Sequence, residues 1–280
     1  MKAVLKWMGG KSRQCDFIWD KCPPTFNDYW EPFVGGASFA LHIYENSDAT
    51  MHLSDINGDL ISFYNALGRD PGLLNYLRKL EKLCKEIDSE EWRSEKYYEL
   101  RKVFNESGSS LMRDGIFYFL NKTCFNGVMR YNASGGFNVP YGKRSFNVDE
   151  KGILEFREFV RDKRANFGVK PFWKIQPQAG DLVYLDPPFN PISETANFTG
   201  YHSTKWGVKQ EARLRVCCDE WTEKGVHILM SNNSTAFIRS LFKGFHFYEQ
   251  QVKKLVGAKS SWRNTVVEVL ISNEKVLKSA

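Results

Sequence analysis

The stretch LVYLDPPF, from Leu182 to Phe189, decides the fold, because an apolar run in it ends at a carboxylate. The run before Asp186 predicts a buried β-strand. Asp186 then lies at the carboxyl end of that strand, where open α/β sheets bind their ligands. Pro187 and Pro188 fix the backbone and donate no N–H, so the Asp186 carboxylate and the Pro187 carbonyl form an acceptor-only corner beside the Phe189 ring. Such a corner suits a planar amine; the alternative is an ordinary strand followed by a proline turn.

The composition is that of a globular protein with a sizeable core. The chain has 280 residues, of which 42% are hydrophobic and 15% aromatic, so we expect one large domain or two smaller ones and no global disorder. No apolar run is long enough to cross a membrane. Residues 1–7 lack the apolar region and the cleavage site of a signal peptide. We therefore expect a cytoplasmic protein that has no membrane partner.

The cysteines and histidines show no metal-binding pattern. The 6 cysteines include no C-x-x-C pair, and the 5 histidines include no H-E-x-x-H motif. We therefore expect no metal site. In a reducing compartment the cysteines are expected to act as small buried hydrophobic residues.

The basic residues are distributed unevenly. A net charge of +6 does not by itself identify a nucleic-acid-binding protein. Residues 122–144, however, carry basic and aromatic side chains and no acidic ones: Lys122, Arg130, Lys143 and Arg144, with Phe125, Tyr131, Phe137 and Tyr141 between them. This mixture suits phosphate contacts, which we expect Lys143 to make, combined with base stacking or wedging. The alternative is a solvated loop whose aromatic residues pack internally.

The hydrophobic periodicity predicts an α/β domain that is interrupted by a helical insertion. The first segments alternate strand and helix, which implies a parallel sheet; they lie at 27–33, 37–44, 50–55 and 59–67. Helical signals without strands then cover 73–104 and 111–120, and a turn at 132–136 between strand-like flanks predicts a β-hairpin. The α/β pattern resumes with helices at 152–160 and 210–224 and strands at 183–186, 227–231, 245–256 and 265–272. We therefore assign 1–67 and 145–280 to the α/β domain and 68–144 to the insertion.

The segment EPFVGGA, from Glu31 to Ala37, predicts a ligand-binding turn. A strand that runs into glycines and then into a helix lets a ligand approach the backbone, here at Gly35. Asp55 ends the next predicted strand, 22 residues after Phe33, which is where a carboxylate usually holds a ribose hydroxyl pair. This pattern suits a cofactor that contains adenosine. The alternative for Asp55 is a helix cap or a turn residue.

The N-terminal segment KWMGGKS, from Lys6 to Ser12, resembles the end of a phosphate-binding P-loop. The glycine that the P-loop motif requires at its first position is replaced by Leu5, and no full strand can precede it. We therefore reject a nucleotide-hydrolysing function. Two interpretations remain open. Lys11 contacts the carboxylate of a cofactor with Trp7 as a wall, or the segment is an ordinary N-terminal turn with a core tryptophan.

These motifs, in this order, resemble the Dam-type DNA adenine-N6 methyltransferases of the D12 class, group alpha. The resemblance covers most of the chain. It includes the lysine-tryptophan segment, the EPF segment, the Asp55 strand, the insertion and the DPPF corner. Two further segments are especially close to bacterial Dam: FNGVMRYN at 125–132 with FNVPYG at 137–142, and TANFTGYH at 195–202. Five ordered motifs are far more specific than any one of them.

The resemblance implies a class I S-adenosylmethionine-dependent methyltransferase fold, in which the insertion recognises double-stranded DNA. It implies transfer of a methyl group from S-adenosylmethionine to the N6 amine of adenine in GATC, by an enzyme that we expect to act as a monomer. The cofactor site would include Trp7, Lys11, Phe33, Gly35, Asp55 and Asp186. The flipped adenine would be held at Asp186, Pro187, Pro188 and Phe189. Contacts to DNA would come from Lys6, Phe125, Asn126, Val128, Arg130, Asn132 and Pro140.

Three positions depart from the family pattern. Phe189 replaces the usual tyrosine, so stacking is kept and a phenol hydrogen bond is not. Ala37 stands where many relatives have glycine, and Phe125 replaces a phenol at the wedge position. The alternatives are the same chemistry on another DNA sequence or on the N4 amine of cytosine, a catalytically silent DNA-binding protein, and methylation of protein glutamine amides. The Lys11, Asp55 and Asp186 set and the basic aromatic segment argue against the last two.

Overall fold

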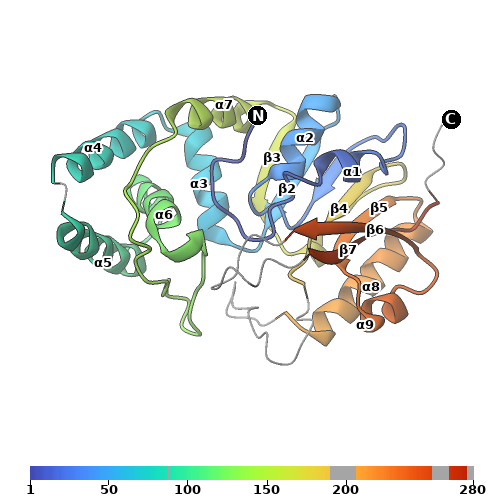
Figure 1. The fold of residues 1–280 in the computed structure, drawn as a ribbon. Coiled ribbons are helices and arrows are strands. Elements are labelled where there is room, and N and C mark those ends of the chain that lie inside the picture. Colours follow the sequence, from blue (N-terminus) through green and yellow to red (C-terminus); the bar gives the residue numbers. More distant parts are fainter. Residues whose placement is uncertain (88, 190–205, 254–264, 276–280) are drawn as a thin grey trace.

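A single seven-stranded sheet forms the centre of the molecule. The structure is a computed structural model that describes residues 1–87, 89–189, 206–253 and 265–275. The strand order is β3-β2-β1-β4-β5-β7-β6 (Figure 1). The strands are β1 (Tyr29–Glu31), β2 (Met51–Asp55), β3 (Ala165–Val169), β4 (Leu182–Leu185), β5 (His227–Asn233), β6 (His246–Lys253) and β7 (Thr265–Ser272).

The strand order reverses between β1 and β4. Strands β1 to β5 run parallel to one another, whereas β7 lies antiparallel between β5 and β6. From β1 the chain moves outward to β2 and β3 on one side, and from β4 it moves to β5 on the other. The carboxyl ends of β1 and β4 therefore open together at a topological switch point, the position where open α/β sheets bind ligands.

Strand β4 is continuously apolar because helices cover both faces of the sheet. Leu182 and Tyr184 belong to one hydrophobic cluster, and Val183 and Leu185 belong to a second. Successive strand residues point to opposite faces, so a strand that is covered on both faces is apolar throughout. The first cluster includes residues of α1 (Cys15–Trp19), α2 (Ser38–Asn46), α3 (Gly58–Arg69) and α7 (Glu150–Arg161). The second includes residues of α8 (Val208–Glu223), α9 (Ala236–Leu241) and the 3-10 turn η2 (Phe172–Lys174).

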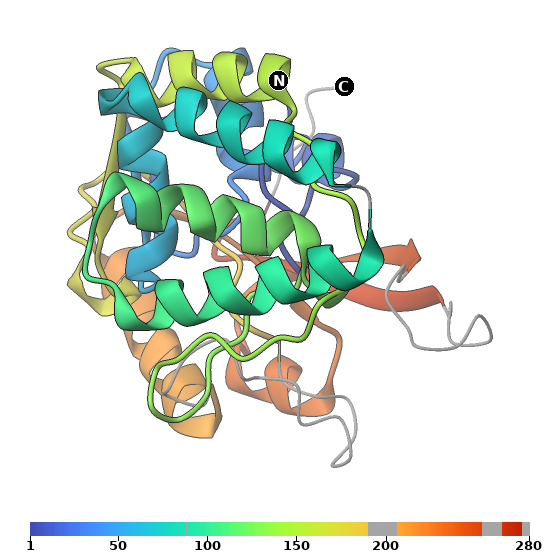
Figure 2. The same ribbon diagram turned by 90° about the vertical axis from the view of Figure 1, so that its left-hand side faces the viewer.

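The predicted insertion is helical. It contains α4 (Gly72–Glu86), α5 (Glu90–Glu106) and α6 (Leu111–Thr123), which Figure 2 shows from their own side of the molecule. The predicted segment 73–104 is two helices, because the Ser89 hydroxyl accepts from the Trp92 N–H and starts α5 there. Helix α6 packs on α3, where the Phe63 ring contacts the rings of Phe117 and Tyr118. The insertion therefore shares one hydrophobic core with the sheet.

The predicted β-hairpin needs correction. Its two arms meet only through two isolated antiparallel bridges, Cys124 with Tyr141 and Tyr131 with Phe137, and not through a regular ladder. The Asn132 side chain replaces ladder pairs at the tip, because its carbonyl oxygen accepts from the N–H groups of Ser134 and Gly136. The predicted strand at 27–33 is also shorter, since only the three residues of β1 pair.

Several other predictions concern residues without a described placement. The Dam-like segment 195–202 and the last residues of the predicted strand at 245–256 lie outside the described residues. Within the part that the structure describes, no helix is long and apolar enough to cross a bilayer.

Candidate active site

A buried ion pair lies at the switch point. Asp186 follows β4 directly, and the Lys11 ammonium lies 2.9 Å from Asp186 Oδ1. The same ammonium lies 4.5 Å from the centre of the Phe189 ring, donates to the Gly9 carbonyl at 3.1 Å, and lies 3.8 Å from Glu268 Oε2. Only 4% of Lys11 is exposed. Two segments that were singled out independently in the sequence are therefore in direct contact.

Acidic groups are concentrated around this ion pair. Burial raises the pKa of the Asp186 carboxyl; the Lys11 ammonium opposes this shift and the Glu268 carboxylate adds to it. Burial also raises the pKa of Glu31 well above its usual range; the Tyr29 hydroxyl, which donates at 2.7 Å, opposes this shift, and Asp186 and Asp55 add to it. Such an environment favours a cation.

A glycine turn connects β1 to the carboxylate at the end of β2. The Gly35 N–H donates to Asp55 Oδ2 at 3.1 Å, and the Asn57 N–H donates to Asp55 Oδ1 at 2.9 Å. Gly35 has a φ of 44°, and a Cβ there would lie 2.7 Å from the Trp7 indole. Glycine is thus required both by the backbone conformation and by the close approach of Trp7.

Asp55 is not a helix cap. The N-cap of α3 is Asn57, whose side chain accepts from the Leu60 N–H at 3.1 Å. Burial raises the pKa of Asp55 to about 6, and the backbone N–H groups of Asn57 and Gly35 oppose this shift. Each carboxylate oxygen that accepts one N–H keeps a further lone pair, so Asp55 can still accept hydrogen bonds from a ligand.

An aromatic wall lies beyond β1. The Phe33 ring lies 5.4 Å from the ring of Phe172 and 5.6 Å from that of Trp206. Phe33 follows β1 just as Asp55 ends β2 and Asp186 follows β4, and these parallel strands are neighbours. Phe33, Asp55 and Asp186 therefore lie side by side at the carboxyl ends of the strands. Among the described residues, no group of His, Cys, Asp and Glu side chains is arranged to hold a metal ion.

Sequence reasoning missed Glu268 and Gln14. Glu268 lies on β7 with only 8% of its surface exposed, and its Oε2 accepts from Gln14 Nε2 at 3.0 Å. The sequence held one signal, because Glu268 is the single charged residue within the apolar run from Val266 to Ile271. A buried carboxylate in such a strand needs a partner, but the sequence does not identify Lys11 as that partner.

The predicted DNA contacts surround the end of α6. Helix α6 leads into the 3-10 turn η1 (Phe125–Gly127) and then into the bridged loop. Phe125 is 52% exposed, and Asn126, Asn132 and Pro140 are also exposed, whereas Val128 and Arg130 are partly buried.

Two basic residues of this loop, Arg130 and Lys143, have acidic or polar neighbours. Arg130 Nε donates to Asn138 Oδ1 at 3.0 Å. Lys143 forms a surface ion pair with Glu90 at 2.8 Å, and 76% of its side chain is exposed. A surface pair of this kind stabilises little, so Lys143 can exchange Glu90 for a phosphate.

Lys6 joins the N-terminal segment to α6 and to the turn η1 that follows it. Its N–H donates to the Asn121 side chain at 2.9 Å, and Asn121 Nδ2 donates back to the Lys6 carbonyl at 2.7 Å. A Cβ on Gly127 would lie 2.8 Å from Lys6 Cβ. Burial and the nearby Arg144 lower the pKa of Lys6, and burial together with Lys6 lowers the pKa of Lys122 to about 8. We call Lys6, Lys122 and Arg144 the cationic cluster.

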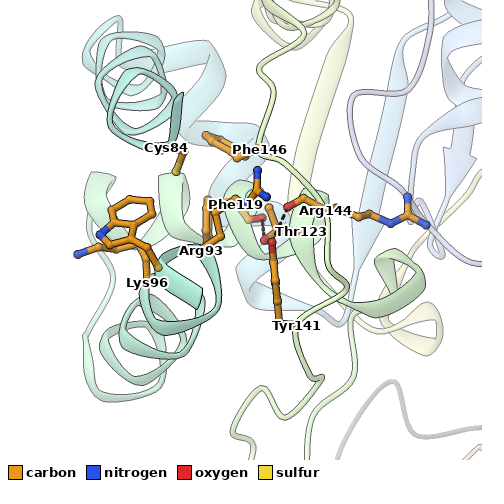
Figure 3. A pocket seen from close by; sticks show the side chains of 9 residues that line it. Cys84, Arg93, Lys96, Phe119, Thr123, Tyr141, Arg144 and Phe146 are labelled. Atoms are coloured by element: carbon orange, nitrogen blue, oxygen red, sulfur yellow. Dashed lines mark hydrogen bonds between the residues drawn. The ribbon is translucent and has the colours of Figure 1, made fainter. Parts of the chain in front are cut away.

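A small pocket lies between α4, α5, α6 and residues 141–146 (Figure 3). Its lining includes Cys84, Lys96 and Phe119, and Tyr141 closes one side by donating its hydroxyl to the Arg144 carbonyl at 3.1 Å. The Arg144 side chain extends away from the other lining residues in Figure 3. It is therefore directed out of the pocket.

Comparison with known proteins agrees with this geometry. Residues 7–255 match the family of D12 class N6 adenine-specific DNA methyltransferases. The chain is 33% identical over 273 residues to the DNA adenine methylase of Vibrio cholerae serotype O1 (96% of this chain, 95% of that protein). It is 32% identical over 277 residues to the DNA adenine methylase of Escherichia coli K12 (96% and 94%). It is 30% identical over 286 residues to the type II methyltransferase M1.LlaDCHI of Lactococcus lactis subsp. cremoris (98% and 95%).

The sheet order, the switch-point site and the matched family define a class I methyltransferase fold. The chain belongs to the D12 class of N6 adenine-specific DNA methyltransferases and is an adenine-specific DNA methyltransferase of the Dam type. The resemblance that was inferred from the motifs, and the fold class that it implied, are confirmed.

Proposed function

We propose that this enzyme transfers a methyl group from S-adenosylmethionine to the N6 amine of adenine in double-stranded GATC sites. The observation that carries the proposal is the position of the Lys11 ammonium. A nitrogen donor bonded to Asp186 lies over the Phe189 ring. An adenine would use the same two features, with its amine on the carboxylate and its ring stacked on the phenylalanine.

The chemistry follows from two acceptors at one corner. The N6 lone pair of adenine is delocalised into the ring, so the free amine is a poor nucleophile. When Asp186 and the Pro187 carbonyl accept hydrogen bonds from the two N6–H groups, the N6 lone pair is localised and directed at the methyl donor. Catalysis then rests on orientation and electrostatics, and no covalent enzyme intermediate is needed.

Residues at the edge of the sheet fit S-adenosylmethionine. The Gly35 turn holds the Trp7 indole against the backbone, and Asp55 beside it can accept from ribose hydroxyls. Trp7 and Phe33 would flank the adenosine, and Lys11 would meet the carboxylate of the cofactor. When bound, the cofactor supplies an electrophilic methyl group on a sulfonium cation. The acidic groups around Asp186 support such a cation.

DNA would bind across the cationic cluster and the loop after α6. We assign DNA recognition to 68–144 and catalysis to 1–67 and 145–280. The exposed Phe125 would wedge into the duplex while the target base flips out toward Asp186. Lys6, Asn126, Val128, Arg130, Asn132 and Pro140 would contact the site, and Lys143 would contact phosphate.

Sequencing of DNA that the purified enzyme has methylated in vitro tests base and target together. We expect N6-methyladenine in GATC, with Asp186→Ala as the background control. Methylation of adenine in another sequence would reject GATC alone. Methylation of cytosine N4 would reject the adenine assignment of the corner.

A further inference from the structure

The Lys11 ammonium occupies the place that the proposed function gives to the target amine. It lies 2.9 Å from Asp186 Oδ1 and 4.5 Å from the centre of the Phe189 ring. A carboxylate oxygen can accept more than one hydrogen bond, but an adenine stacked on Phe189 with its amine at Oδ1 would fill the space that the ammonium occupies. The target base can therefore enter only if Lys11 leaves Asp186. This step rests on the proposed function.

The Lys11 ammonium is not solvated by bulk water in its present position. Only 4% of the residue is exposed, and a buried ammonium without an anionic partner is strongly unfavourable. Its bond to the Gly9 carbonyl, at 3.1 Å, is to a neutral acceptor. Without the cofactor, whose carboxylate is the other partner proposed for Lys11, the displaced ammonium therefore requires a second carboxylate of the protein close by.

Glu268 is that second carboxylate. Its Oε2 lies 3.8 Å from Lys11 Nζ, and in the described part of the chain it is the other acidic group within ion-pair distance of Lys11. Gln14 Nε2 holds this oxygen at 3.0 Å. In the sheet, Glu268 pairs with Asn233 of β5 and Gln250 of β6, so its backbone is fixed on both sides.

We propose that Glu268 is a positioning residue that receives the Lys11 ammonium when the target adenine takes Asp186. Lys11 then moves between two carboxylates and keeps an ionic partner in both states. Glu268 makes base entry favourable, although it does not contact the base.

The test uses duplex DNA with 2-aminopurine at the target adenine, whose fluorescence rises when the base leaves the stack. Glu268→Gln keeps the shape of the side chain and removes its charge. We expect it to reduce the equilibrium constant for base entry by about tenfold, because one end of the exchange has lost its ionic partner. Overall affinity for DNA should stay within about twofold, since the cationic cluster is intact. The matched control, Glu249→Gln on the neighbouring strand β6, should behave as the wild type.

A double variant separates positioning from a purely structural role. Lys11→Met removes the ammonium and keeps the length of the side chain. In that background Glu268→Gln should have no further effect on base entry, because no ammonium needs to be received. Base entry is measured without the cofactor, so any role of Lys11 in cofactor binding does not enter the result.

The outcomes distinguish this inference from the proposed function. Wild-type base entry in Glu268→Gln, or an equal loss in the Lys11→Met background, would overturn the role of Glu268 while leaving adenine methylation in place. If the wild-type enzyme methylates no adenine and draws no 2-aminopurine out of the duplex, the proposed function itself fails.

Discussion

At the scale of single residues, burial determines the chemistry of the site. Asp55, Glu31 and Asp186 are all carboxyl groups whose pKa is raised, and burial is the largest cause for each. The groups differ in their partners. Backbone N–H groups hold Asp55, a tyrosine hydroxyl holds Glu31, and a lysine holds Asp186. Only Asp186 has a partner that must leave before the proposed reaction can proceed.

Asp186→Ala should lower turnover by at least ~100-fold, which is the scale for removing one preorganised electrostatic partner. Affinity for DNA should change little, because the cationic cluster lies elsewhere. Turnover is measured as labelled methyl transfer to DNA, and DNA affinity by fluorescence anisotropy. Turnover within a few-fold of the wild type would contradict the role of Asp186.

Affinity for S-adenosylmethionine should fall as the pH drops below about 6, because the pKa of Asp55 lies there and only the ionised carboxylate accepts from both ribose hydroxyls. Asp55→Asn should bind more weakly at neutral pH and show less of this pH dependence. Calorimetry across the pH range measures both effects. An unchanged affinity in the variant would place the ribose elsewhere.

The same pKa has a consequence for stability. The folded state holds the Asp55 proton up to about pH 6, whereas the unfolded state releases it near the ordinary aspartate pKa of 3.8. Between these values the folded state binds more protons, so the contribution of Asp55 to the free energy of unfolding decreases as the pH rises.

At the scale of elements, the end of α6 combines burial with like charges. Lys122 lies in the last turn of α6, next to Lys6, and its ammonium lies 5.0 Å from the centre of the Tyr118 ring. The helix C-terminus favours a cation, but burial and the neighbouring lysine act against it. Such a cluster destabilises the free protein, and binding of an anion such as a DNA phosphate would offset this cost.

Lys122→Met should therefore stabilise the protein and weaken DNA binding. Near neutral pH we expect the free energy of unfolding to rise by on the order of 1–2 kcal/mol, because the raised energy of the buried ammonium is removed. The gain should shrink as the pH rises from about 8, where the folded-state Lys122 loses its proton. Urea unfolding at several pH values measures it, and a destabilised variant would mean that the Lys122 side chain contributes mainly through packing.

Arg130 and Lys143 should have different effects on specificity. Arg130→Ala should cost ~1–3 kcal/mol of discrimination at one base pair if it contacts a guanine edge. Lys143→Ala should weaken binding to all sequences about equally and flatten the salt dependence. Both variants are assayed on singly substituted GATC duplexes. If Arg130→Ala slows every duplex by the same factor, Arg130 contacts phosphate and does not read a base.

The elements differ in how far the sequence could predict them. β4 was predictable because both of its faces are buried, which leaves a continuous apolar run. β3 was missed because it lies at the edge of the sheet and only its first residue is buried. The short helices α1 and α9 contain too few turns to show a periodicity. The hairpin was overestimated, because turn residues predict a reversal of the chain but not the pairing of its arms.

The sequence identifies candidate site residues by their local motifs, but it does not predict which of them contact one another. Lys11, Asp55 and Asp186 each follow or precede a recognisable turn. The approach of Glu268 to Lys11 depends on β7 lying beside β5 in an antiparallel direction, and no local pattern encodes that placement.

At the scale of the whole molecule, the insertion is part of the same folding unit as the sheet. Phe63 of α3 contacts Phe117 and Tyr118 of α6, and one hydrophobic cluster extends from β4 to α5. The boundary at 68–144 therefore separates proposed functions and not hydrophobic cores.

The protein should consequently unfold in a single cooperative transition. Phe63→Ala should lower its stability by about 3–5 kcal/mol, because it opens a cavity where the insertion meets the sheet domain, and should leave the transition single. Calorimetry and circular dichroism measure this, with the exposed Phe237→Ala as a control. Two resolved transitions in the wild type would mean that the insertion folds independently.

The N-terminal segment contacts all three regions to which the proposed function assigns the DNA, the cofactor and the target base. Lys6 is bonded to Asn121, Trp7 lies against the Gly35 turn, and Lys11 holds Asp186. A shift of this segment would therefore change the contacts at the proposed DNA surface, at the proposed cofactor pocket and at Asp186. If DNA changes the affinity for the cofactor through it, thermodynamic reciprocity requires the cofactor to change the affinity for DNA by the same factor. This short N-terminal segment would then couple the binding of DNA to the binding of the cofactor.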